Sequence, residues 1–114
     1  MTGRRWWRSL GLGLGVTVLL VTASYGDDKD CARVATQERG LFCGPESLMV
    51  MVQNICNHPI QISICVEETG GEWDCGLDRN IQPEKYMGRW TCKGTGKYHY
   101  LGCSRDAQTC NAHP

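Results

Sequence analysis

The chain of 114 residues has few of the residues from which active sites and metal sites are built. It contains only three histidines, and it lacks any Cys-x-x-Cys pair, which argues against a zinc knuckle or a thiol redox site. No segment repeats at a fixed period. The sequence therefore assigns no catalytic residue, no metal site and no cofactor.

The chain also lacks an apolar run long enough to cross a membrane. Residues 10–23 would span about 21 Å as a helix, against a hydrocarbon core of about 30 Å. This run follows three arginines and ends in Val21-Thr22-Ala23, whose small residues suit a signal-peptidase site. We expect residues 1–23 to be a cleaved signal peptide. Residues 24–114 would then be one secreted or periplasmic domain with no stable membrane anchor.

Neither sign of charge dominates the sequence. The chain has 12 basic and 12 acidic residues, and three of the basic ones lie in the expected signal peptide, which leaves the mature chain at −3. A mildly acidic domain has no general attraction for nucleic acid or for anionic lipid. We therefore expect no nucleic-acid partner.

Cysteine is the residue that the chain has in excess, with eight in the expected mature domain. A core of this size gives only marginal stability, whereas a native disulfide typically contributes about 2–4 kcal/mol. An even number of cysteines behind an export signal predicts four structural disulfides and no free thiol. Eight cysteines allow about a hundred connectivities, and the sequence leaves the choice open. The cysteines expected to pair are Cys31, Cys43, Cys56, Cys65, Cys75, Cys92, Cys103 and Cys110.

The first part of the expected mature domain predicts a short helix over residues 31–39. Asp30 suits the N-cap position, and Gly40 suits the position after the last helical residue. The apolar residues would form only a narrow face on this helix, so a structured loop is the alternative.

The best evidence for strands lies between residues 47 and 68. An apolar run over residues 48–52 is followed by a break at Asn57-His58-Pro59. After the break, residues 60–67 place an isoleucine or valine at every second position, which is the pattern of a half-buried strand. We expect these two strands to pair antiparallel through a tight polar turn.

Residues 69–72, with sequence Thr-Gly-Gly-Glu, predict a second reversal of the chain. Strands on either side of this turn would bring Cys65 and Cys75 nearly opposite each other. They are a candidate disulfide.

The last third of the chain predicts one more hairpin and a polar tail. The glycine-rich residues 93–97 would connect strands over residues 89–92 and 98–101. Residues 104–114 would form a loop closed by Cys110. The expected fold is a small disulfide-rich β protein, a compact antiparallel sheet or sandwich with at most one short N-terminal helix.

Two short segments resemble known families. Residues 52–60 resemble the Val-x-Asn-x-Cys hairpin that opens thaumatin-like proteins, over nine residues of a chain much shorter than that family. Residues 94–98 resemble the glycine-rich loop of bacterial C-type lysozyme inhibitors. That family inserts a serine and a lysine or arginine into the lysozyme cleft, and the resemblance implies that Thr95 and Lys97 stand in for them. Neither segment identifies a family.

Charge polarity along the chain supports a binding function. An acidic cluster over residues 67–78 precedes a basic and aromatic stretch over residues 85–100. One interpretation makes these charges solvated faces and places Trp73 and Trp90 in the core. The other makes the aromatic residues a recognition surface flanked by cations, for an extracytoplasmic protein or glycan. The binding residues of this hypothesis are Arg89, Trp90, Lys93, Lys97, Tyr98 and Tyr100.

We therefore expect a small exported inhibitor or partner-binding module, and two other functions stay open. His99 with a nearby glutamate, and with Arg89 or Lys97 stabilising a developing anion, would make a small secreted hydrolase of the ribonuclease kind. The third function is a structural component of the cell envelope.

Overall fold

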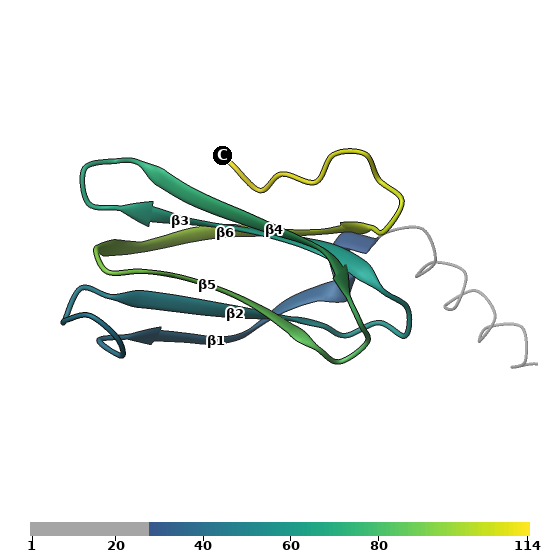
Figure 1. Cartoon of the computed structure of the whole chain (residues 1–114), viewed down its shortest axis with the longest axis horizontal. Helices are drawn as coiled ribbons and strands as arrows, with labels where there is room; N and C mark the ends of the chain where they lie inside the picture. The colour runs from purple at the N-terminus through teal and green to yellow at the C-terminus, as the bar shows by residue number, and fades with distance from the viewer. Residues whose placement is uncertain (1–27) are drawn as a thin grey trace, which may run out of the picture.

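A computed structural model describes residues 28–114, and the expected signal peptide and its cleavage site lie outside this range. The described chain forms two three-stranded antiparallel sheets that pack face to face (Figure 1). Sheet A has the strand order β1-β2-β5, and sheet B has the order β4-β3-β6. This confirms the expected small β protein. Its elements are a 3-10 turn, η1 (Asp28–Cys31), and the strands β1 (Ala32–Arg39), β2 (Leu48–Asn54), β3 (Ile60–Glu68), β4 (Trp73–Ile81), β5 (Tyr86–Thr91) and β6 (Gly94–Ser104).

One hydrophobic core lies between the two sheets. Along β2, every second residue from Leu48 to Asn54 is buried, as expected for a strand that turns one face inward. The isoleucines and valine of β3 meet this face from the other sheet. Burying one such side chain stabilises the fold by about 1.5–3 kcal/mol.

The helix predicted for residues 31–39 is wrong, because this segment forms strand β1 and pairs with β2. Its apolar residues are too few for a helical face, and an isolated helix of this length is marginal in water. The edge of β2 instead supplies hydrogen-bonding partners along the whole segment. The disulfide between Cys31 and Cys56 holds the beginning of the strand.

The expected pairing of residues 48–52 with residues 60–67 is also wrong. The two strands lie in different sheets, β2 in sheet A and β3 in sheet B. Their apolar faces bury each other across the core, which a side-by-side pairing would not achieve.

Buried Asn54 holds the connection between β2 and β3. Its Nδ2 donates to the carbonyls of His58 and Ile81, both at 2.9 Å, and its Oδ1 accepts from the backbone N–H of Cys56 at 2.9 Å.

The glycine-rich turn near residue 94 does not close a hairpin either. Strands β5 and β6 exist close to where they were expected, but β5 belongs to sheet A and β6 to sheet B. The connection is fixed to both sheets, because Gly94 donates to the Glu46 carbonyl at 2.8 Å and Thr69 donates to the Lys93 carbonyl at 2.9 Å. The reversal at residues 69–72 is confirmed, and it joins β3 to β4.

Strand β3 is buried on both faces rather than on one, because the C-terminal tail covers its outer face (Figure 1). Gln61 donates to the carbonyls of Ser104 at 2.9 Å and Ala107 at 2.8 Å, and it accepts from the Arg79 guanidinium at 2.9 Å. Ser63 accepts from the backbone N–H of Ala112 at 3.0 Å. Gln61 and Ser63 of β3 therefore bind the tail instead of water.

All eight cysteines are paired, as predicted. Cys65 and Cys75 lie directly opposite each other on β3 and β4, which confirms the candidate bridge. Four disulfides in a small domain are typical of extracellular proteins. Within residues 28–114, no helix is long and apolar enough to span a membrane. The pairs are Cys31–Cys56, Cys43–Cys92, Cys65–Cys75 and Cys103–Cys110.

Candidate binding site on strand β5

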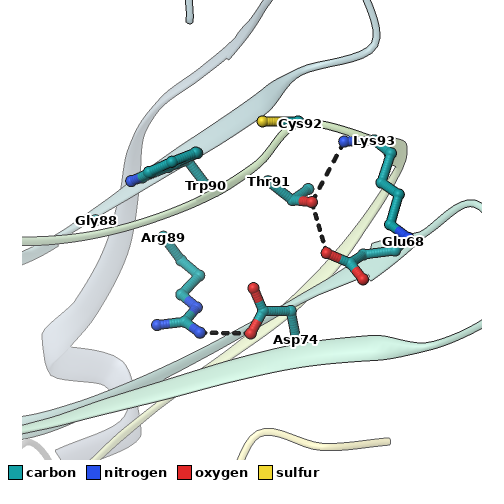
Figure 2. Close-up of a pocket in the computed structure, with 8 residues that line it drawn as sticks. All are labelled: Glu68, Asp74, Gly88, Arg89, Trp90, Thr91, Cys92 and Lys93. Carbon is teal, nitrogen blue, oxygen red and sulfur yellow. Dashed lines mark hydrogen bonds and ion pairs between the residues drawn. The ribbon is translucent and has the colours of Figure 1, made fainter. Parts of the chain in front are cut away.

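Strand β5 lies at the edge of sheet A and presents two different surfaces. Successive side chains of a strand point to opposite faces, and Arg89 is paired with Val50, whose side chain is buried in the core. Arg89 therefore points between the sheets, and Trp90 points outward. Figure 2 shows these two side chains on opposite sides of the β5 ribbon. The interpretation of Trp90 as a core residue is wrong, since 53% of its surface is exposed.

The outer surface is a cluster that we call the aromatic face. Phe42 and Trp90 are in contact, with ring centroids 5.6 Å apart. Met51 lies across Gly88 of β5, and a Cβ at Gly88 would come within 2.6 Å of the Met51 sulfur. A side chain at position 88 would therefore displace Met51. The aromatic face consists of exposed Phe42, Tyr86 and Trp90 with half-buried Met49 and Met51 between them.

A disulfide brings Phe42 to this face. Cys43 is bonded to Cys92 at the end of β5, so the loop over residues 40–47 is tied beside Trp90. The same loop is closed by a hydrogen bond from the Gly40 N–H to the Ser47 carbonyl at 3.0 Å. Phe42 is the only phenylalanine in the chain, and it stands next to a cysteine. Its contact with Trp90 depends on which cysteines pair.

The inner surface of β5 lines an open pocket of about 480 Å³ at the side of the sandwich (Figure 2). Arg89 forms an ion pair with Asp74 of β4. Thr91 donates to a Glu68 carboxylate oxygen at 2.7 Å and accepts from the backbone N–H of Lys93 at 3.3 Å. The lining residues are Glu68, Asp74, Gly88, Arg89, Trp90, Thr91, Cys92 and Lys93.

Arg89 is held inside the sandwich by close packing. A Cβ at Gly76 of β4 would lie 2.5 Å from a terminal nitrogen of Arg89, so the guanidinium rests on the backbone there. The Nε of Arg89 is buried and has no hydrogen-bond partner among the described residues. Asp74 is therefore the group that compensates this partly buried charge. Two acids and two bases line the pocket, so a charged group that entered it would find an opposite charge there.

The structure separates the six residues of the predicted binding surface. Arg89, Trp90 and Lys93 lie on or next to β5, whereas the other three lie on β6 in the opposite sheet. Tyr98 packs against the hydrophobic core, Tyr100 is partly exposed, and Lys97 is exposed. No single hairpin carries all six.

His99 lies on the outer face of sheet B, next to Trp73, with ring centroids 5.2 Å apart. Arg89 points between the sheets, so the two residues do not face a common site. Nearby Glu67 accepts a hydrogen bond from the Thr95 hydroxyl at 2.7 Å. The grouping of His99 with Arg89, which the hydrolase hypothesis invoked, is not formed.

Of the aromatic face, sequence reasoning had placed only Trp90 in a binding surface. Met49 and Met51 belong to the apolar run over residues 48–52, whose alternate members point away from the core. Tyr86 falls within the basic and aromatic stretch over residues 85–100 but was not assigned to the site. Phe42 gave no local signal, because a disulfide between distant cysteines brings it to this face. Comparison of the chain with protein families, with curated proteins and with solved structures finds no match.

Proposed function

We propose that this chain is an exported binding protein that attaches non-covalently to another protein outside the cytoplasm, through the aromatic face of sheet A. Its four disulfides and the expected signal peptide over residues 1–23 support a secreted or periplasmic location. An inhibitor and a partner-binding module share this mode of action, since both bind another protein tightly without catalysing a reaction.

The observation that carries the proposal is the contact between two exposed aromatic rings on a rigid support. Phe42 and Trp90 expose 56% and 53% of their surfaces while they touch each other. Large apolar patches on a soluble domain mark interaction sites, and tryptophan is enriched among the residues that dominate binding energy. The disulfide at Cys43 fixes both rings before a partner arrives, so little conformational freedom is lost on binding.

The surroundings of the aromatic face favour a protein partner over a glycan. Met49 lies beside Trp90, and it is a flexible apolar side chain that adapts to protein surfaces. Charged residues border the apolar ones: Glu38 of β1 lies directly opposite Met49, Arg33 of β1 lies opposite Gln53, and Lys93 follows the end of β5. An apolar centre with a polar rim is the usual anatomy of a protein–protein interface.

The proposal is tested by site-specific photo-crosslinking. A photoreactive amino acid replaces Tyr86 at the border of the face, and proteins crosslinked in the native extracytoplasmic fraction are identified by mass spectrometry. We expect one dominant partner protein, whose crosslink is lost when Phe42→Ala and Trp90→Ala are added. The matched control is Leu77→Ala, an exposed apolar residue of sheet B, which should leave the crosslink intact. Equal crosslinking with and without the Phe42 and Trp90 substitutions would contradict the proposal.

A further inference from the structure

We propose that two copies of this protein associate through the free edge of β5, so that their two A sheets join into one continuous sheet. The association goes beyond partner binding and does not depend on it. It would place the second copy's Tyr86 next to Trp90 and so complete the aromatic face from two chains.

The free edge of β5 offers unpaired backbone groups. Asn54 donates to the Lys85 carbonyl at 3.0 Å, and hydrogen-bonded pairs alternate along an antiparallel ladder. Residues 85, 87, 89 and 91 therefore direct their backbone groups toward β2. The N–H and C=O groups of Tyr86, Gly88 and Trp90 point away from sheet A, where no strand of the described chain pairs with them.

This edge has only part of the usual protection against pairing. The β1–β2, β3–β4 and β3–β6 ladders each contain a shift in register, whereas the β2–β5 ladder is regular from Leu48 to Gln53. Bulges, prolines and charged side chains are the devices that keep natural edge strands apart. Neither a proline nor a bulge interrupts β5. Its one charged side chain, Arg89, points inward, which is itself a protective device, but the ion pair with Asp74 already compensates this charge.

The three free positions are symmetric about Gly88. When two β5 strands pair antiparallel around a two-fold axis at Gly88, Tyr86 of each copy lies opposite Trp90 of the other. Such self-complementary pairing is the rule for two-fold dimers. Cross-strand aromatic pairs stabilise antiparallel sheets, and glycine at the axis leaves room for Met51 to stay in place.

Charges at the two ends of β5 complement each other in this arrangement. Glu84 precedes the strand and Lys93 follows it, so antiparallel pairing brings Glu84 of each copy near Lys93 of the other. The Arg89 side chains of the two copies approach on the inner side, and each is already neutralised by its own Asp74. The strand is short, and a stable interface buries about 1,200 Å² or more, so we expect a reversible dimer that depends on concentration.

Sedimentation velocity on the purified exported protein, with no other protein present, tests the association from about 1 μM to about 1 mM. We expect a shift from monomer to dimer across this range. Glu84→Lys alone and Lys93→Glu alone should each shift the dissociation constant upward at least about tenfold, because like charges then face each other. The double variant Glu84→Lys/Lys93→Glu should restore the dimer. A double variant as weak as the single variants would overturn the proposal, as would a monomer at every concentration.

Hydrogen exchange identifies the surface that the copies use. In the dimer the amides of Tyr86, Gly88 and Trp90 should become protected relative to the monomer, whereas amides on the exposed edge of β1 should not. A dimer that leaves these three amides unprotected uses another surface and overturns the proposal. Because both measurements use the isolated protein, neither result bears on the proposed partner.

Discussion

Phe42 and Trp90 are in contact although they lie in distant parts of the chain, and the disulfide between Cys43 and Cys92 stands directly beside that contact. The pairing of two cysteines therefore determines whether the chain presents one aromatic cluster or two isolated rings. Stability and the proposed recognition surface therefore depend on the same covalent bond.

Removing this bond with Cys43→Ser and Cys92→Ser should lower the free energy of unfolding by about 2–4 kcal/mol and release the loop over residues 40–47. Urea unfolding and limited proteolysis of that loop measure the two effects. The matched control is Cys103→Ser with Cys110→Ser, which removes a disulfide far from the loop. A loop equally resistant to protease in both double variants would contradict this prediction.

Trp90→Ala should cost little stability, about 1 kcal/mol or less, because more than half of the side chain is exposed. Ile62→Ala should cost about 2–5 kcal/mol, because Ile62 is fully buried between the sheets. Chemical unfolding of the two variants under the same conditions provides the comparison. If the tryptophan variant lost as much stability as the isoleucine variant, Trp90 would be needed to stabilise the fold and would not be a residue reserved for contact with a partner.

Asp74→Asn should destabilise the fold by about 1–2 kcal/mol, since it leaves the Arg89 guanidinium between the sheets without an opposite charge. The figure is modest because both side chains are about one-third exposed, at 32% and 36%. Asp78→Asn on the same strand is the control, because Asp78 is exposed and its one hydrogen bond, to the Asn80 N–H, survives in the amide. Equal stability of the two variants would show that the ion pair is not needed.

Gln61→Ala should loosen the C-terminal tail, because one side chain holds the carbonyls of both Ser104 and Ala107. We expect a loss of about 1–3 kcal/mol and faster hydrogen exchange in residues 105–112. Gln82→Ala is the control, since Gln82 is exposed and, among the described residues, its side chain bonds only to the Asn80 side chain. Unchanged exchange in the tail would mean that the disulfide to Cys110 holds it without help.

Local patterns in the sequence predicted β2, β3, β5 and β6, but not β1, whose residues were expected to form a helix. The alternation over residues 60–67 belongs to β3, and the reversal at residues 69–72 correctly placed Cys65 opposite Cys75. These features depend on neighbours within about ten residues of chain. A period of two shows which side chains share a face of a strand.

Strand partners were harder to predict than strands. The pattern that makes β2 apolar on one face is satisfied equally by a hairpin with β3 and by packing against β3 across a core. In the structure, buried Asn54 holds the crossover through hydrogen bonds to His58 and to the distant Ile81, and the contact with Ile81 has no signal in the local sequence. The aromatic face was missed for the same reason, because Phe42 reaches Trp90 only through a distant disulfide.

The order of the disulfides along the chain has a consequence for protease damage. The bridges Cys31–Cys56 and Cys43–Cys92 interlace, so a single cut anywhere between Cys31 and Cys92 leaves the two fragments covalently joined. A cut between Cys92 and Cys103 is different, because the only bridge beyond it, Cys103–Cys110, lies wholly within the released fragment. Strand β6 and the tail would then be held by hydrogen bonds and packing alone. The connection at residues 93–94 is thus the point where one nick turns a stapled domain into a two-piece complex that can exchange its last strand.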